Sequence, residues 1–176
     1  MDAYGNFTSL QDFTTGSVIQ LTSYLDPDIV LDTHAVFDQW GDMTSTNVGV
    51  HRLSNGPTTT SHLIVDSGWE QDPSNDQFCL LFNQYGIVLS WAINGPRGFP
   101  LELVMVGSNV GPDYSKFTVD FVDGPWFALN TPDRTLVADI SESGTAEGSP
   151  IIGFPWNGGA NQIWRAQRVG TVPVQN

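Results

Sequence analysis

The feature that most restricts the fold is a pattern of four short strands that occurs three times along the chain. In each copy, a short apolar run flanked by turn-forming residues is followed by three further runs of the same kind, which is typical of β-strands. The first runs span 16–21, 76–81 and 124–129; the second 29–32, 87–90 and 136–139; the third 48–53, 100–106 and 150–154; the fourth 61–65, 115–119 and 162–166.

The spacing of these runs shows that the copies stay in step. The second runs end at 32, 90 and 139, intervals of 58 and 49, and the fourth begin at 61, 115 and 162, intervals of 54 and 47. A single unit would expose its apolar face, and closing three units on one another buries it. We therefore predict one all-β domain over residues 1–176, with twelve strands in repeats of about 14–70, 71–122 and 123–170. A sandwich or a three-bladed assembly is the alternative.

The first repeat is longer because residues 33–47 are inserted between its second and third strands. The insert carries Asp38, Trp40 and Asp42. Long segments without a strand pattern lie on the surface and often carry function, so we expect an exposed loop here.

The charge of the chain excludes several classes of partner. The chain has 6 basic and 19 acidic residues and a formal net charge of −13. Nucleic-acid binding requires a basic face, and anionic lipid also attracts basic segments, so we expect neither partner. No apolar stretch has membrane-spanning length, so we expect no membrane insertion.

The cysteine content and the N-terminus suggest a compartment. Cys79 is the only cysteine, so no intramolecular disulfide can form. Residues 1–5 lack the basic and apolar regions of a signal peptide. We expect a cytoplasmic protein, or one secreted by a leaderless route.

No motif for catalysis or metal binding is visible. His34, His51 and His62 lack the spacing of zinc ligands. The aspartates between 26 and 42 lack the spacing and glycine of a calcium loop. We expect no cofactor, no metal and no enzymatic activity, because no local pattern supplies a nucleophile, a base and an orienting group.

The third repeat resembles a known family. Residues 137–140, 148–152 and 158–164 are similar to a repeat of the ricin-B-type lectins, with a complete Gln-x-Trp signature at residues 162–164. Residues 61–63 and 115–117 are altered versions of that signature. The resemblance covers roughly 14–170, is closest to small fungal members, and implies a β-trefoil fold with pseudo-threefold symmetry.

The resemblance also implies a sugar site in the third repeat. Asp139 would accept bonds from sugar hydroxyls, Phe154 would stack on the C–H face of the ring, and Asn161 would add a hydrogen bond. Trp156 is a second candidate for stacking, and Gln162 would steady the site. We expect Asp139 to be exposed.

The other repeats depart from this set. The first keeps Asp32 but offers Arg52 or Leu53 at the aromatic position and Thr60 at the asparagine position. The second has Ser90 in place of the aspartate. Near its aromatic position it offers Val104 or Met105.

Two functions therefore remain open. The first is a non-enzymatic lectin for galactose-type or N-acetylated sugars, with a homodimer expected if a single site has to support agglutination. The second is a protein-binding trefoil with vestigial sugar sites, either a protease inhibitor or the companion subunit of an enzyme. Its loops 33–47, 66–76 and 107–114 would then contact the partner.

Overall fold

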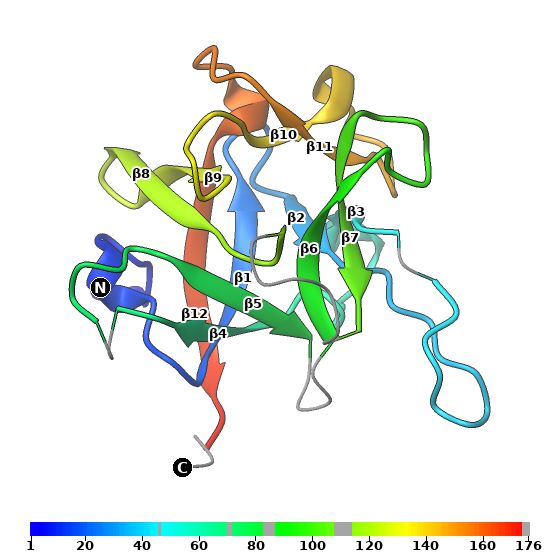
Figure 1. The fold of residues 1–176 in the computed structure, drawn as a ribbon, viewed down its shortest axis with the longest axis horizontal. Helices are drawn as coiled ribbons and strands as arrows, with labels where there is room; N and C mark the ends of the chain where they lie inside the picture. The colour runs from blue at the N-terminus through cyan, green and yellow to red at the C-terminus, as the bar shows by residue number, and fades with distance from the viewer. Residues whose placement is uncertain (46, 70–71, 83–86, 108–113, 174–176) are drawn as a thin grey trace.

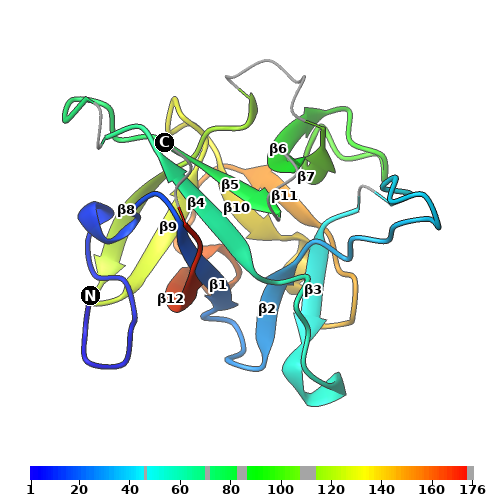
Figure 2. The ribbon, with the colours of Figure 1, turned by 90° about the horizontal axis from the view of Figure 1, so that it is seen from below.

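The computed structural model describes residues 1–45, 47–69, 72–82, 87–107 and 114–173. These residues form twelve strands joined in one sheet (Figures 1 and 2). Residues 70–71 and 108–113, within two of the loops expected to contact a protein, lie outside the described residues. In the described part of the chain, no helix is long and apolar enough to cross a membrane.

The first and fourth strands of the repeats build a barrel. Neighbouring strands pair antiparallel around it, and a bridge between Phe78 and Phe117 joins β5 to the segment that leads into β8. Closure leaves the barrel without a free edge. The barrel strands are β1 (Ser17–Ser23), β4 (Leu63–Ser67), β5 (Phe78–Phe82), β8 (Thr118–Asp123), β9 (Trp126–Asn130) and β12 (Trp164–Thr171).

The second and third strands of each repeat form a hairpin. The hairpins touch one another through Glu102 opposite Ile152, Asn47 opposite Val104 and Gly49 opposite Pro150. A barrel with such a triangle of hairpins is a β-trefoil, which confirms the predicted fold over the sandwich and the three-bladed assembly. The hairpin strands are β2 (Ile29–Asp32) with β3 (Gly49–Arg52), β6 (Ile87–Ile93) with β7 (Leu101–Val106), and β10 (Val137–Ile140) with β11 (Ile151–Phe154).

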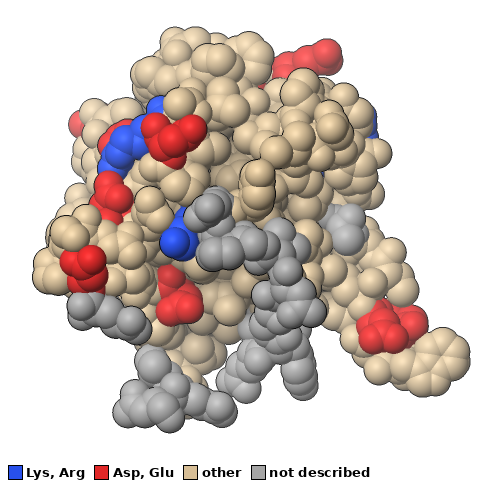
Figure 3. Space-filling view, viewed as in Figure 1, with Lys and Arg blue, Asp and Glu red and all other residues tan. Residues whose placement is uncertain are grey.

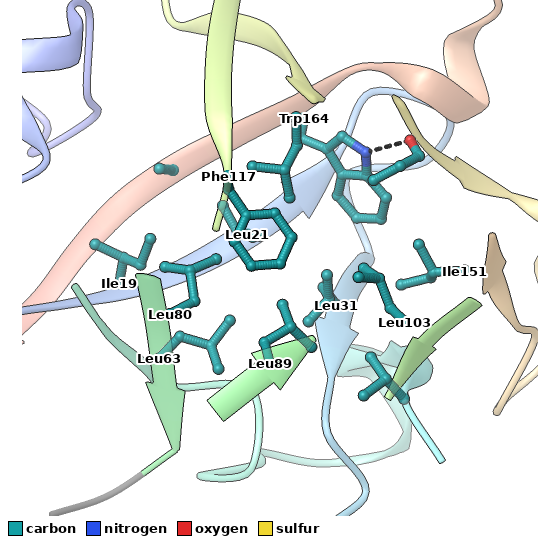
Figure 4. Packing of buried hydrophobic residues seen from close by; sticks show 14 of the residues in the cluster. Ile19, Leu21, Leu31, Leu63, Leu80, Leu89, Leu103, Phe117, Ile151 and Trp164 are labelled. Atoms are coloured by element: carbon teal, nitrogen blue, oxygen red, sulfur yellow. Dashed lines mark hydrogen bonds between the residues drawn. The ribbon is translucent and has the colours of Figure 1, made fainter. Parts of the chain in front are cut away.

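The core repeats the same positions in the three units. Leu63, Phe117 and Trp164, the last residue of each signature, are all fully buried in one cluster (Figure 4). The indole N–H of Trp164 donates to the carbonyl of Ala138 at 3.0 Å, so the buried ring loses no hydrogen bond. The side chain that closes each repeat therefore varies in size while its place in the core is kept.

The N-terminal segment adds to this core, which the repeat pattern did not predict. Phe7 and Phe13 are fully buried, and Phe13 stacks on Phe78 with ring centroids 4.6 Å apart. Phe7 and Phe13 pack edge to face, with ring centroids 4.8 Å apart. Residues before the first strand thus complete the apolar interior.

The insert of the first repeat forms an exposed loop, as expected. Figures 1 and 2 both show it projecting between β2 and β3. A bridge between Phe37 and Met43 pairs its two arms, and the Asp38 carboxylate accepts the backbone N–H groups of Trp40 and Asp42 at 2.9 Å each. Trp40 is 78% exposed between them.

Candidate functional site

The five predicted residues of the third repeat lie on three neighbouring segments. Asp139 is on β10, Phe154 ends β11, and Trp156, Asn161 and Gln162 follow in the segment that leads to β12. Because β10 and β11 pair antiparallel, with Asp139 opposite Ile152, the end of β11 lies beside the carboxylate strand. Gln162 bonds both to Asp139 and to the carbonyl of Pro155, which brings the segment after β11 to the same place.

The Asp139 carboxylate is held by two side-chain amides. Its Oδ1 accepts from Asn161 Nδ2 at 3.0 Å, and its Oδ2 accepts from Gln162 Nε2 at 2.8 Å. A carboxylate oxygen has two lone-pair sites, so each oxygen keeps capacity for a ligand hydroxyl. The two amides therefore orient the Asp139 carboxylate and leave part of its hydrogen-bonding capacity free.

Asp139 is more recessed than the sequence predicted. Only 4% of the residue is exposed, so the expectation of an exposed carboxylate was wrong. Burial raises the pKa of Asp139, and the amide bonds from Gln162 and Asn161 offset that rise only in part. The site therefore presents a desolvated acceptor, which strengthens a hydrogen bond made to it.

Gln162 acts as a brace and is fully buried. Its amide also donates to the carbonyl of Pro155 at 3.0 Å, and its Oε1 accepts the backbone N–H of Asn157 at 2.8 Å. These bonds fix the segment that carries Trp156 against Asp139. Gln162 therefore positions the site, and with its amide satisfied it has little left to offer a ligand.

Asn161 occupies a confined place next to the carboxylate. Its Nδ2 also donates to the carbonyl of Ile140 at 3.1 Å, which aims both amide hydrogens inward. A Cβ on Gly159 would lie 2.5 Å from Asn161 Oδ1, so only glycine leaves room for this placement. Among the described residues, no donor bonds to Asn161 Oδ1, which is therefore available to a ligand.

Two aromatic side chains give the site its apolar surface. Phe154 is 45% exposed and Trp156 is 46% exposed, and residues 154–158 are all exposed. The structure thus brings together a recessed polar pair, Asp139 and Asn161, with an exposed aromatic pair. Such a set matches a ligand that has hydroxyl groups on one side and C–H groups on the other.

In the first repeat, the corresponding acceptor is already occupied. Asp32 is 1% exposed and accepts the hydroxyls of Thr58 and Thr60, each at 2.7 Å, and the backbone N–H of His34 at 2.6 Å. Thr60 takes the predicted place of Asn161. The short threonine side chains hold the carboxylate tightly.

The aromatic position of the first repeat is His51. His51 pairs with Val30 as Phe154 pairs with Val137, two residues before the aspartate in each case. The prediction of Arg52 or Leu53 was wrong because it did not count the hairpin register from Asp32. The register observed in the structure places His51 there.

His51 is engaged by the third repeat. Its Nδ1 lies 2.7 Å from Glu147 Oε1, and its Nε2 lies 2.9 Å from the carbonyl of Gly56. Glu147 also accepts the backbone N–H of Arg52 at 3.0 Å. This position therefore joins two repeats.

The second repeat has no carboxylate at the equivalent place. Ser90 pairs with Val104 and donates its hydroxyl to the carbonyl of Tyr114 at 2.9 Å. By the same register, the aromatic position is Val106, which pairs with Val88. Val104 and Met105, predicted to lie near this position, are the two residues directly before it.

Charged side chains are sparse on the face of the molecule drawn in Figure 3. Figure 3 shows a largely uncharged face with separate acidic groups and few basic ones, in line with 19 acidic and 6 basic residues. Within the described ranges, no group of three or more His, Cys, Asp or Glu side chains could hold a metal ion.

Comparisons by sequence find no matching protein-family model and no matching curated protein. Solved structures match in fold. The Rhizoctonia solani agglutinin is 18% identical with a TM-score of 0.64, covering 87% of this chain and 95% of the agglutinin. The Macrolepiota procera ricin B-like lectin, solved in complex with lactose, is 16% identical with a TM-score of 0.63, covering 88% and 97%.

An exo-β-1,3-galactanase from Clostridium thermocellum is 15% identical with a TM-score of 0.64, covering 87% of this chain but 30% of the enzyme. The chain thus has the fold of the ricin-B-like β-trefoil lectins.

Proposed function

We propose that the chain is a non-enzymatic carbohydrate-binding protein whose sugar site is in the third repeat. One observation carries the proposal: Asp139, a carboxylate braced by two amides, lies on the strand that pairs with β11, which ends at the exposed Phe154, and its brace Gln162 bonds to the residues on either side of the exposed Trp156. Lectin folds among the solved structures support it. The likeness to the galactanase covers 30% of that enzyme, so it concerns only that part of the enzyme.

Each group has a defined task in this proposal. Vicinal hydroxyls of the sugar donate to Asp139, and a further hydroxyl donates to the Oδ1 of Asn161. The C–H face of the pyranose lies on Phe154 or Trp156. Because Asp139 is recessed, only a hydroxyl that protrudes from the sugar can reach it. We therefore expect the site to bind the terminal sugar of a glycan.

The sugar that suits this set best is galactose-type or N-acetylated. Galactose has a continuous C–H face on the side opposite its axial hydroxyl, which a flat ring can cover. An acetamido group adds a methyl for the second ring. Lactose, the ligand of the Macrolepiota lectin complex, ends in galactose and is the first ligand to test.

A titration with lactose tests the proposal, with N-acetylgalactosamine as second ligand. Phe154→Ala and Trp156→Ala should each weaken binding about tenfold, the effect of ~1.4 kcal/mol of lost stacking and burial. Tyr4→Ala is the matched control, because Tyr4 is an aromatic side chain 80% exposed elsewhere. Equal loss in all three variants, or no binding by folded protein to any glycan of an array, would refute the sugar site.

Protein binding is the second candidate function, and the projecting loop favours it. Trp40 is held between two paired arms, so little conformational entropy is lost when it enters a partner's pocket. Two results together would favour this function. No glycan of an array would bind the protein, and a protein partner captured by the wild type would not be captured by Trp40→Ala. If Trp40→Ala still captured that partner, the loop would be excluded as the contact surface.

A further inference from the structure

The outer face of the barrel carries a row of three side chains whose order is set by strand register. Asp66 on β4 pairs with Cys79 on β5. On the other side of β5, an antiparallel bridge joins Phe78 to Phe117, and the next residue in that order places Lys116 beside Cys79. Because Phe78 and Phe117 point into the core, their neighbours Cys79 and Lys116 point outward.

This row borders a hollow of about 190 Å³. Asp66 is exposed, and Cys79 and Lys116 are half-buried, so a molecule in the hollow can contact them. The half-buried Asn75 lines the same hollow with its side-chain amide. A Cβ on Gly68 would lie 2.5 Å from Asn75 Nδ2, so only glycine leaves room for that amide.

The two charged groups of the row are not paired. Within the described ranges, neither Asp66 nor Lys116 belongs to an ion pair, whereas Arg52, Arg97 and Arg134 each pair with a carboxylate. Neighbouring strands lie about 4.8 Å apart, so positions 66 and 116 are separated by about 10 Å across β5. The hollow thus has an anionic side and a cationic side that do not neutralise each other.

Cys79 lies between the two charges and is itself uncharged. Burial raises the pKa of Cys79, the Asp66 carboxylate adds to the rise, and the Lys116 ammonium opposes it. Both charged groups therefore act on the sulfur, and the thiol is protonated at neutral pH. The middle of the row is a neutral surface on which the body of a ligand can lie.

A molecule that carries both charges fits this arrangement better than a molecule with one. An α-amino acid separates its ammonium from its carboxylate by roughly 3 Å. With a charge-assisted hydrogen bond at each end, it spans about 9 Å, close to the separation of the two strand positions. Because it has no net charge, the formal charge of −13 on the chain does not repel it, as it would repel a simple carboxylate.

We propose that this hollow binds the zwitterion of a small α-amino acid, with its ammonium on Asp66 and its carboxylate on Lys116. The side-chain amides of Asn75 and Gln77, which line the hollow, are further donors for the carboxylate. The hollow shares no residue with the sugar site of the third repeat. Each proposal can therefore fail without the other.

Three matched ligands test the proposal on the full chain. L-Alanine carries both charges, L-alaninamide lacks the carboxylate, and N-acetyl-L-alanine lacks the ammonium. NMR titration followed at the backbone amides of Cys79 and Lys116 measures the affinity of each. Alanine should bind about fivefold or more tightly than either analogue, because each analogue loses one charge-assisted hydrogen bond.

Two variants assign the two ends of the ligand. Lys116→Gln should remove the preference for alanine over alaninamide and keep the preference over N-acetylalanine, whereas Asp66→Asn should do the reverse. Asp123→Asn, at an exposed position outside the hollow, is the matched control and should change neither preference. Each variant gives an answer even if the other does not fold.

The proposal is overturned by any of three results. The first is that alanine does not bind to the folded wild type. The second is that either analogue binds as tightly as alanine. The third is that the preferences of the wild type persist in Lys116→Gln and Asp66→Asn.

Discussion

The Asp139 carboxylate shows how one side chain serves both the fold and the site. Its two amide partners also bond elsewhere, Gln162 to Pro155 and Asn161 to Ile140. Removing the carboxylate therefore leaves each amide with one backbone acceptor. The aspartate is a part of the local structure as well as the candidate ligand group.

Asp139→Ala should lower the free energy of unfolding by about 1–3 kcal/mol, because it leaves buried amide hydrogens without an acceptor. The same variant should lose sugar binding. Urea denaturation measures the first effect, with Asp66→Ala as a control on an exposed strand position where a change within about 0.5 kcal/mol is expected. A neutral Asp139→Ala would show that the two amides find other partners.

Trp164 tests the core of the repeat at the same scale. Trp164→Ala should cost about 3–5 kcal/mol, because it removes the largest of the fully buried side chains and leaves a cavity. Leu63→Ala, at the equivalent position of the first repeat, should cost less, about 2–4 kcal/mol, since a smaller volume is lost. The two midpoints in urea provide the comparison, and a near-neutral Trp164→Ala would refute the shared core position.

At the scale of elements, the sequence was informative about strands and less so about their registers. The four runs of each repeat were placed within a few residues, because apolar runs between glycine, proline and asparagine clusters have few other solutions. Phe7 and Phe13 were missed because nothing in a segment before the first repeat signals burial. Likewise, His51 was missed because a hairpin register depends on its loop, here the 33–47 insert.

The hydrogen bonds of His51 and Arg52 to Glu147 join β3 to the β10–β11 loop, and we call this contact the clasp. Its strength depends on the protonation of His51. Both ring nitrogens face acceptors, Glu147 Oε1 and the carbonyl of Gly56, so only the imidazolium can donate to both. Burial opposes protonation, but these bonds outweigh it and raise the pKa of His51, with a further contribution from Asp32. The His34 ring, with its centroid 6.5 Å away, is the other titratable neighbour.

The stability gained from the clasp should therefore depend on pH. A pKa raised on folding means that the contribution is complete below the unfolded value of about 6.5 and is lost as the pH rises through the folded value. Melting temperatures of the wild type and His51→Gln should converge between about pH 6 and pH 9. His62→Gln controls for loss of an imidazole, and a constant difference between wild type and His51→Gln would contradict an imidazolium clasp.

At the scale of the whole molecule, one arginine links the three repeats. Arg97, in the second repeat, donates to the carbonyls of Val48 in the first and Gly148 in the third, and pairs with Glu102. Glu102 is fully buried and lies where β7 meets β11. The sequence did not reveal this link, because contacts at the symmetry axis join residues about fifty positions apart.

Arg97→Ala should therefore be among the most destabilising single changes in the chain. It leaves the Glu102 carboxylate buried without its counter-ion, for which about 3–5 kcal/mol is expected. Arg134→Ala is the matched control, since Arg134 also pairs with two carboxylates, Asp76 and Asp120, but does so on the surface, where a loss of about 0–1 kcal/mol is expected. Urea denaturation of both variants gives the comparison. If the hairpin triangle is held by this link, Arg97→Ala should also raise the exchange of β7 and β11 amides with solvent. Equal costs for the two arginines would instead assign the cohesion of the three repeats to the apolar core alone.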